Sequence, residues 1–198
     1  MTGKLIVIEG IDGSGKTTIS KMLLRELRSR GIRAVYTYEP INKEFIDLIE
    51  IYGRRLGAEI EALLLAADRY VHVRDFIVPN LRRGYVIICD RYFYSSIAYQ
   101  GARGADVRWI RSLNKFAVKP NIAIYLDVRP EIGISRIKSK NGRKLSYLED
   151  ISVLRRVREI YLSLVNNGEL VLVNAEATID EVFKEVYELV IKVLECKN

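Results

Sequence analysis

The sequence predicts a single α/β domain, residues 1–198, with a parallel five-stranded sheet and helices on both of its faces. The chain of 198 residues is long enough for one well-buried core and short for two. Hydrophobic residues make up 49% and charged residues 29%, as in globular proteins. Short apolar runs alternate with amphipathic stretches from end to end. Parallel strand pairing with right-handed crossovers produces this order.

Each element of this fold has its own segment of sequence. Apolar runs predict the strands Leu5–Ile8, Ala34–Tyr38, Tyr85–Cys89, Ile122–Leu126 and Leu170–Val173. Amphipathic patterns predict the helices Thr17–Arg30, Glu44–Tyr52, Ala58–Arg83, Val107–Phe116, Glu131–Lys138, Asp150–Val165 and Ile179–Leu194. The polar segment Lys138–Lys144, KSKNGRK, interrupts the pattern and is expected to form a loop. We find no internal repeat and no linker, which favours one domain.

Composition excludes several classes of protein. Cys89 and Cys196 are too few for a disulfide framework or a metal cluster, and His72, the only histidine, argues against a catalytic triad. The net charge of +7 fits either nucleic-acid binding or a phosphate site, but the basic residues are scattered, so we expect no nucleic-acid partner. No apolar run approaches the ~20 residues of a membrane span. The run Leu5–Ile8 is shorter than the roughly 7–15 residues of a signal-peptide core, so a cytoplasmic location is expected.

A phosphate-binding motif follows the first predicted strand. Residues 10–17, GIDGSGKT, match G-x-x-x-x-G-K-[ST] at every fixed position, between a strand and a helix. Lys16 is expected to reach the β- and γ-phosphates of ATP, and the Thr17 hydroxyl to hold Mg²⁺. The predicted cofactor-binding residues are Gly10, Asp12, Gly13, Ser14, Gly15, Lys16, Thr17 and Thr18. The motif in this context predicts a P-loop NTPase fold with ATP and Mg²⁺ as cofactors.

An Asp-Arg pair ends the third predicted strand. Ligands of open α/β sheets bind beyond the carboxyl ends of the strands, so Asp90 and Arg91 should face the same crevice as the P-loop. Asp90 is expected in the Mg²⁺ shell, and Arg91 is expected to neutralise the transferred phosphoryl group. Tyr92 and Tyr94 beyond the pair fit core aromatics as well as site residues.

The P-loop leaves the class of protein open. Neither Asn42-Lys43 nor Asn114-Lys115 is followed by the aspartate of the base-reading motif of GTPases. A kinase for a small acceptor needs a second anion pocket and a cover that excludes water. Arg69 and Arg91 are candidates for the pocket, and the basic segment Lys138–Lys144 is a candidate for the cover.

Five segments, the P-loop among them, match the motifs of a known family in order along the chain. They are IEGIDGSGKTT (8–18), TYEP (37–40), LLLAADR (63–69), DRYFYSSIAYQG (90–101) and PNIAIYLDVRPEIGISRI (120–137). Together they resemble the thymidylate kinases, a family of nucleoside monophosphate kinases, over nearly the whole chain. The resemblance implies transfer of the γ-phosphoryl group of ATP to dTMP, which gives dTDP and ADP, in a homodimer that binds small nucleotides.

The resemblance also implies roles for single residues. Asp12 would bond the 3′-hydroxyl of the acceptor sugar or assist the metal, Arg69 would grip the acceptor phosphate, and Arg91 would bridge both phosphates. Tyr99 would crowd the 2′ position and so favour deoxyribose. The implied catalytic residues are Lys16, Asp90, Arg91 and the lid residue Arg143. The implied acceptor-binding residues are Asp12, Glu39, Leu65, Arg69, Arg91, Ser96, Tyr99 and Gln100, with a lid at about 138–148.

The chain departs from the pattern of this family at several positions. Tyr38 replaces the usual arginine before Glu-Pro, and Leu65 stands where a phenylalanine usually stacks on the base. Ser14 leaves the P-loop without the arginine that some members carry, and an Asp-Arg pair is absent from the lid sequence. The alternatives are therefore a kinase for another nucleoside monophosphate or for a deoxynucleoside, or a non-catalytic ATP-binding protein.

Overall fold

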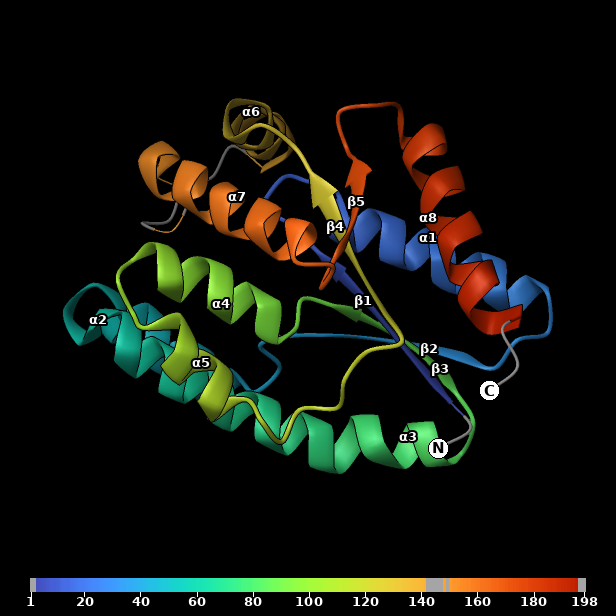
Figure 1. The fold of residues 1–198 in the computed structure, drawn as a ribbon, viewed down its shortest axis with the longest axis horizontal. Coiled ribbons are helices and arrows are strands. Elements are labelled where there is room, and N and C mark those ends of the chain that lie inside the picture. Colours follow the sequence, from blue (N-terminus) through green and yellow to red (C-terminus); the bar gives the residue numbers. More distant parts are fainter. Residues whose placement is uncertain (1–2, 142–147, 149, 196–198) are drawn as a thin grey trace.

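A computed structural model describes residues 3–141, 148 and 150–195 of the chain. It contains a five-stranded sheet in the order β2-β3-β1-β4-β5, and every neighbouring pair is parallel (Figure 1). The strands are β1 (Lys4–Glu9), β2 (Ala34–Tyr38), β3 (Val86–Asp90), β4 (Ile122–Asp127) and β5 (Val171–Asn174). Apart from end residues, these are the five segments that the apolar runs predict. The predicted sheet is therefore confirmed.

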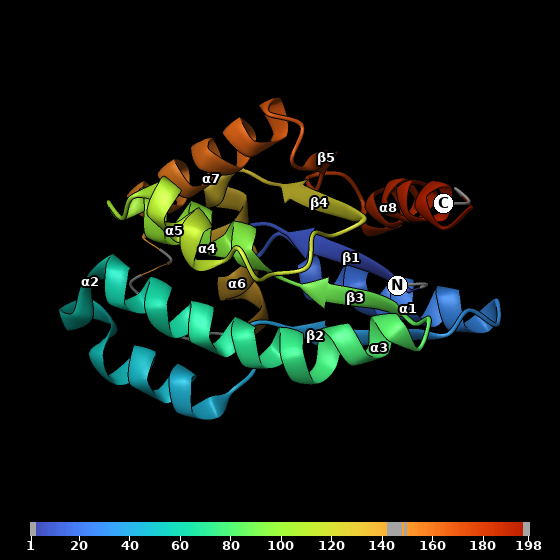
Figure 2. The same ribbon diagram turned by 60° about the horizontal axis from the view of Figure 1, so that its bottom comes forward.

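Helices cover both faces of this sheet. The helices of the described chain are α1 (Lys16–Ser29), α2 (Lys43–His72), the π-helical turn η1 (Val73–Ile77), α3 (Val78–Arg82), α4 (Phe93–Ala102), α5 (Val107–Leu113), α6 (Pro130–Asn141), α7 (Ile151–Asn166) and α8 (Ile179–Glu195). Helices α1 and α8 pack side by side on one face, while α2, α4 and α7 pack together on the other (Figures 1 and 2). Buried aliphatic side chains from strands and helices form one continuous core between them. This layering confirms the predicted α/β class.

The structure locates the break in one predicted helical region and corrects the end of another predicted helix. The predicted break between Tyr52 and Ala58 is present, because Gly57 interrupts α2 with a φ of 77°, a left-handed value that glycine adopts without a Cβ clash. The predicted loop at Lys138–Lys144 was wrong for its first residues, since α6 continues to Asn141. Lysine is a good helix former, and the breaking Asn-Gly pair comes only at residues 141–142. The remainder of that segment lies outside the described residues.

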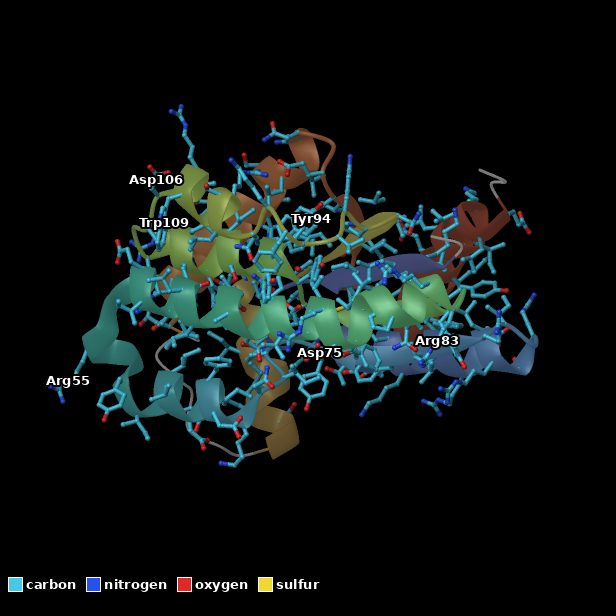
Figure 3. The ribbon with its side chains drawn as sticks, turned by 90° about the horizontal axis from the view of Figure 1, so that it is seen from below. Arg55, Asp75, Arg83, Tyr94, Asp106 and Trp109 are labelled. Carbon is cyan, nitrogen blue, oxygen red and sulfur yellow. The ribbon has the colours of Figure 1, made fainter. Side chains whose placement is uncertain are left out.

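Helix α4 was not predicted as a helix. It is short, and its Tyr, Ser and Ile residues give little helical periodicity, because α4 is buried from several sides by α2, α5 and α7. Tyr92 and Tyr94 belong to the core, and Trp109 packs partly buried against it. Figure 3 shows Tyr94 on α4 and Trp109 on the neighbouring α5. Among the described residues, no helix is both long and apolar enough to cross a membrane.

The sheet brings the two sequence motifs together. Strands β1 and β3 are neighbours, with Ile8 opposite Asp90. The chain that leaves β1 therefore enters the P-loop beside the point where β3 delivers Asp90 and Arg91. Connections leave these two strands in opposite directions, towards β2 and towards β4. Such a reversal opens a crevice at the carboxyl edge of an α/β sheet.

Candidate active site

The P-loop is curled by glycines and lies directly against α6. Gly10, Gly13 and Gly15 have φ values of 154°, 81° and 95°. A Cβ on Gly13 would overlap the carbonyl group of Gly133 on α6, and a Cβ on Gly133 would lie 2.7 Å from the backbone oxygen of Asp12. Only two glycines allow this approach of backbone to backbone. The position of α6 is thus coupled to the shape of the phosphate loop.

Lys16 stands at the start of α1 and is buried. Its Nζ donates a hydrogen bond of 2.8 Å to the carbonyl oxygen of Ile11 and lies 3.8 Å from an Asp12 carboxylate oxygen. Burial, followed by the positive charge of Arg91, lowers the pKa of Lys16 to about 8, although nearby carboxylates oppose this shift. An ammonium group that is poorly solvated gains more from a phosphate than an exposed one does. Lys16 therefore has the setting of a phosphate ligand.

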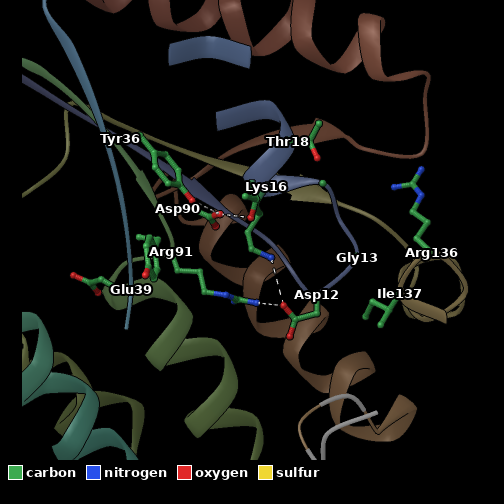
Figure 4. Close-up of a pocket in the computed structure, with 13 residues that line it drawn as sticks. Asp12, Gly13, Lys16, Thr18, Tyr36, Glu39, Asp90, Arg91, Arg136 and Ile137 are labelled. Carbon is green, nitrogen blue, oxygen red and sulfur yellow. Dashed lines mark hydrogen bonds and ion pairs between the residues drawn. The ribbon is translucent and has the colours of Figure 1, made fainter. Parts of the chain in front are cut away.

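A hydroxyl and a carboxylate meet beside Lys16. Thr17 donates from Oγ1 to Oδ2 of Asp90 over 2.6 Å, and the Tyr36 hydroxyl lies 3.4 Å from the same oxygen (Figure 4). Burial and the Asp90 charge raise the pKa of Tyr36, so its phenol stays protonated and can donate. Hard oxygen donors of this kind suit Mg²⁺, which keeps several waters and needs few protein ligands. The predicted pair Thr17 and Asp90 fits that ion.

Arg91 holds an unusual backbone conformation at the centre of the site. It is the one described non-glycine residue with a positive φ, 70°, and a residue kept in this region is strained and often functional. Its guanidinium donates to Asp12 over 2.5 Å and to Ser95 over 3.1 Å, and it lies 5.1 Å from the centre of the Tyr99 ring. Figure 4 shows Arg91 and Lys16 converging on Asp12. Two cations thus flank one carboxylate beside the P-loop.

Two cavities meet at Arg91. The first has a volume of about 620 Å³ and is lined by the P-loop, Asp90 and Arg91, and by Arg136 and Ile137 from α6. Of the predicted cofactor-binding residues, those at its surface are Asp12, Gly13, Gly15, Lys16, Thr17 and Thr18. Gly10 lines neither this cavity nor the smaller one that Ser14 lines. The predicted loop thus forms one wall of this cavity.

The second cavity, of about 310 Å³, gathers every residue predicted to bind the acceptor. They are Asp12, Glu39, Leu65, Arg69, Arg91, Ser96, Tyr99 and Gln100, which come from the P-loop, the end of β2, α2, the end of β3 and α4. Three of them, Asp12, Glu39 and Arg91, line the first cavity as well. The two cavities therefore communicate across these three side chains.

Arg69 is buried in the wall of the second cavity. Its guanidinium donates to Glu39 over 2.6 Å, to Asn114 over 2.5 Å and to Ser96 over 3.2 Å. A guanidinium carries five N–H groups, so these bonds leave two for another partner. Glu39 balances the charge of Arg69 inside the buried wall, and the guanidinium is fixed by three bonds, so Arg69 is a well-oriented donor for a neutral group.

His72 supports this arrangement from behind. Its Nδ1 lies 2.9 Å from Glu39, and its Nε2 lies 2.7 Å from the hydroxyl of Thr37. The side chain is fully buried and lines neither cavity. His72 therefore occupies a structural position among the described residues. Glu39, His72 and Cys89 form a buried cluster of potential metal ligands, but the Arg69 guanidinium fills the remaining side of Glu39 and disfavours a cation there.

Polar groups on α4 face the far side of the second cavity. Gln100 donates from Nε2 to Glu61 over 3.2 Å, and Glu61 also pairs with Arg103. Within the described part of the chain, Oε1 of Gln100 is buried and has no hydrogen-bond partner. Buried polar atoms are seldom unpaired. A ligand with an N–H group would satisfy this oxygen.

Several residues of the site carry no signal in the sequence that we used. Tyr36, Ser95, Glu61 and Asn114 contact predicted site residues, and Glu9 bonds Ser95 in turn. Its position directly after the first predicted strand could have marked Glu9, whereas the other four depend on tertiary packing. The predicted catalytic residue Arg143 lies outside the described residues, and Arg136 is the basic residue of α6 that reaches the first cavity.

Comparison with known proteins agrees with this geometry. The sequence model of the family described as thymidylate kinase matches residues 8–186. A probable thymidylate kinase of Staphylothermus marinus is 47% identical over 191 residues, which cover 96% of each chain. Those of Pyrococcus horikoshii and Sulfolobus acidocaldarius are 42% and 43% identical, over 96% and 94% of this chain and 97% and 95% of theirs. This chain therefore belongs to the thymidylate kinase family.

Proposed function

We propose that this protein transfers the γ-phosphoryl group of ATP to dTMP and releases dTDP and ADP. The observation that carries the proposal is the pair of cavities joined through Asp12, Glu39 and Arg91. One cavity has the P-loop and metal ligands of a donor site, and the other has the size and polar wall of a nucleotide acceptor site. Family membership supports the same reaction.

The donor is held by the P-loop and α1. The backbone of residues 10–15 and the buried Lys16 ammonium receive the β- and γ-phosphates, and Thr17 and Asp90 hold Mg²⁺. When bound, Mg²⁺ neutralises charge on the phosphates. A third cavity of about 260 Å³ lies beyond Gly13 and Gly15, with an apolar wall formed by Ala175, Ala177 and Ile179. We propose that it receives the adenine of ATP.

The acceptor is held between α2 and α4. Arg91 lies where the cavities meet, so we assign it both phosphates, with Asp12 left to bond the sugar 3′-hydroxyl or assist the metal. The charge of Arg69 is already balanced by Glu39. We therefore propose for Arg69 a contact with the polar edge of the base, together with Ser96 and Gln100, in place of the acceptor phosphate. Leu65 contributes apolar contact below the base.

Catalysis then consists mainly of alignment and charge stabilisation. The acceptor phosphate is already an anion at neutral pH, so no strong general base is needed. Lys16 and Arg91 supply preorganised positive charge where charge develops in the transition state. Since the P-loop has Ser14 in place of an arginine, the transition-state charge is met either by the lid or by Lys16 alone. We propose that the lid, at about 138–148, supplies Arg143, which acts together with Arg136 of α6, within one domain of residues 1–198.

An exposed apolar stripe on α2 supports a homodimer. Ile60, Leu63 and Tyr70 are 41%, 43% and 51% exposed, and their spacing places them on one side of the helix. Two copies can cover the same stripe symmetrically. We propose a cytoplasmic homodimer that uses small nucleotides and binds neither nucleic acid nor membrane.

An acceptor panel tests this function. ADP formation from ATP and Mg²⁺ is measured with dTMP, dUMP, TMP, UMP, dCMP, AMP and thymidine as separate acceptors. We expect the highest kcat/KM with dTMP, and Lys16→Ala to reduce its turnover at least ~100-fold because a preorganised cation is lost. A different preferred acceptor would reassign the substrate, and ATP binding without acceptor-dependent ADP would contradict a kinase.

A further inference from the structure

Glu9, the last residue of β1, is a buried carboxylate to which the reaction described above gives no role. It is 0% exposed and accepts four hydrogen bonds from three residues. Oε1 receives the backbone N–H groups of Tyr92 (2.8 Å) and Ser95 (3.3 Å), and Oε2 receives the hydroxyl groups of Ser95 (2.6 Å) and Tyr161 (2.8 Å). Three of these donors lie just after Arg91 and the fourth lies on α7. Glu9 thus ties β1 to both segments.

Ser95 connects this carboxylate to the guanidinium of Arg91. A serine hydroxyl has one proton and two lone pairs. Ser95 directs its proton to Glu9, so a lone pair is left for Nη1 of Arg91, which lies 3.1 Å away. If the Ser95 hydroxyl pointed the other way, its proton would face the positively charged guanidinium of Arg91. The negative charge of Glu9 therefore fixes the direction in which Ser95 can receive Arg91.

Glu9 also supports the strained backbone at Arg91. The left-handed φ of 70° is held on one side by the bond from the Arg91 N–H to Ile8, 3.0 Å. On the other side it is held by the bond from the Tyr92 N–H to Glu9. Such a conformation persists only where its surroundings over-determine it. Glu9 therefore constrains both the backbone and the side chain of Arg91.

The carboxylate is held there at a cost in stability. Burial raises the pKa of Glu9, and the bonds from Ser95 and Tyr161 and the charge of Arg91 only partly oppose the shift. A group with a raised folded-state pKa contributes stability below its unfolded pKa, and this is lost as the pH rises through the folded value. At neutral pH an ionised Glu9 therefore lowers stability. Buried groups of this kind are candidates for a functional role.

We propose that Glu9, acting through Ser95, is the positioning residue that aims Arg91 at the phosphates shared by the two cavities. This inference rests on the proposed phosphoryl transfer and adds a residue to it. A small misplacement of a catalytic group costs up to about 10²-fold in rate. We accordingly expect Glu9→Gln, which keeps the shape of the side chain, to lower kcat with dTMP by about 10- to 100-fold.

Three readouts separate this role from a merely structural one. The melting temperature of Glu9→Gln should equal or exceed that of the wild type, because a costly buried charge is removed. Its affinity for dTMP should fall while its affinity for thymidine, which lacks the phosphate, stays unchanged. Ser95→Ala should likewise lower the affinity for dTMP and leave that for thymidine unchanged. Ser95→Thr keeps the hydroxyl and should therefore be more active than Ser95→Ala. Tyr125→Phe removes a buried hydroxyl that bonds Asp127 and not Glu9, and is the matched control.

A double-mutant cycle with Arg91→Lys completes the test. If Glu9 acts through Arg91, Glu9→Gln has little further effect on kcat in that background. Wild-type kcat in Glu9→Gln, or equal losses in both backgrounds, overturns the inference and leaves the proposed activity standing. Should the wild type phosphorylate no nucleotide, the proposed function fails. In that case the crystal structure of Glu9→Gln tests the inference without an activity assay. We expect the Arg91 guanidinium to lose its hydrogen bond to Ser95, and a guanidinium in its original position overturns the inference.

Discussion

The protonation of Lys16 sets the pH range in which the free enzyme captures ATP. Its pKa of about 8 means that the cation is lost as the pH rises through 8. Bound phosphates stabilise the charged form and raise that pKa. We therefore expect kcat/KM for ATP, which reports the free enzyme, to fall above about pH 8, while kcat stays constant to higher pH.

A charge-retaining variant identifies the group that titrates. Arginine does not lose its proton in this range, so Lys16→Arg should be less active and lack the alkaline decline in kcat/KM. The measurement is a pair of pH–rate profiles between pH 6 and 10 in buffers of constant ionic strength. An alkaline decline that persists unchanged in Lys16→Arg would assign the titration to another residue.

Arg69 gives a second prediction for a single residue. Arg69→Gln removes the cation that balances the buried Glu39 carboxylate, and loss of one partner of a buried pair costs about 3–5 kcal/mol. Adding Glu39→Gln should restore much of the stability, because the uncompensated charge is removed. If Arg69 contacts the base, its loss weakens binding of dTMP and of thymidine by a similar factor. Titration calorimetry measures the affinity for each ligand. If only the affinity for dTMP falls, Arg69 contacts the acceptor phosphate and not the base.

Among the helices, α6 acts on the P-loop through the contact of Gly133 with Gly13 and Asp12. Gly→Ala in a helix ordinarily adds stability, about 0.5–1 kcal/mol. Gly133→Ala should do the opposite, because its Cβ would lie 2.7 Å from the Asp12 backbone oxygen. We expect a lower melting temperature and at least a ~10-fold loss of kcat/KM for ATP. Ser135→Ala is the control, because this position is exposed on the same helix, and it should change neither quantity. If Gly133→Ala also leaves both the melting temperature and kcat/KM unchanged, the P-loop moves aside without cost and the proposed coupling is wrong.

Most elements could be predicted from the sequence because their signals are local. Apolar runs and the Gly–Lys–Thr spacing lie within a few residues of one another, so the sheet, the P-loop and the break at Gly57 follow from them. The residues that orient the site depend on contacts distant in sequence: Tyr161 bonds Glu9 across 152 positions. Helix α4 was not predicted for the same reason, because its burial depends on helices that are distant in sequence. The motif resemblance supplied acceptor residues that periodicity alone does not mark.

For the whole molecule, the α2 stripe predicts the assembly. Leu63→Glu places a charge within the proposed symmetric interface and should convert a dimer to a monomer in light scattering. Ile151→Glu introduces the same charge at an exposed apolar position on α7 and should leave the mass unchanged. Because α2 also carries Leu65 and Arg69, the monomer should bind dTMP more weakly. A wild-type chain that is monomeric at micromolar concentration would contradict the proposal.

The three side chains shared by the two cavities have a thermodynamic consequence. Two anionic ligands that use one guanidinium, Arg91, cannot bind independently, so their affinities are linked by a coupling free energy. Whatever factor bound ATP imposes on the Kd of dTMP, bound dTMP imposes on the Kd of ATP. A residue that sets the position of Arg91 therefore changes the communication between the substrates as well as the reaction between them.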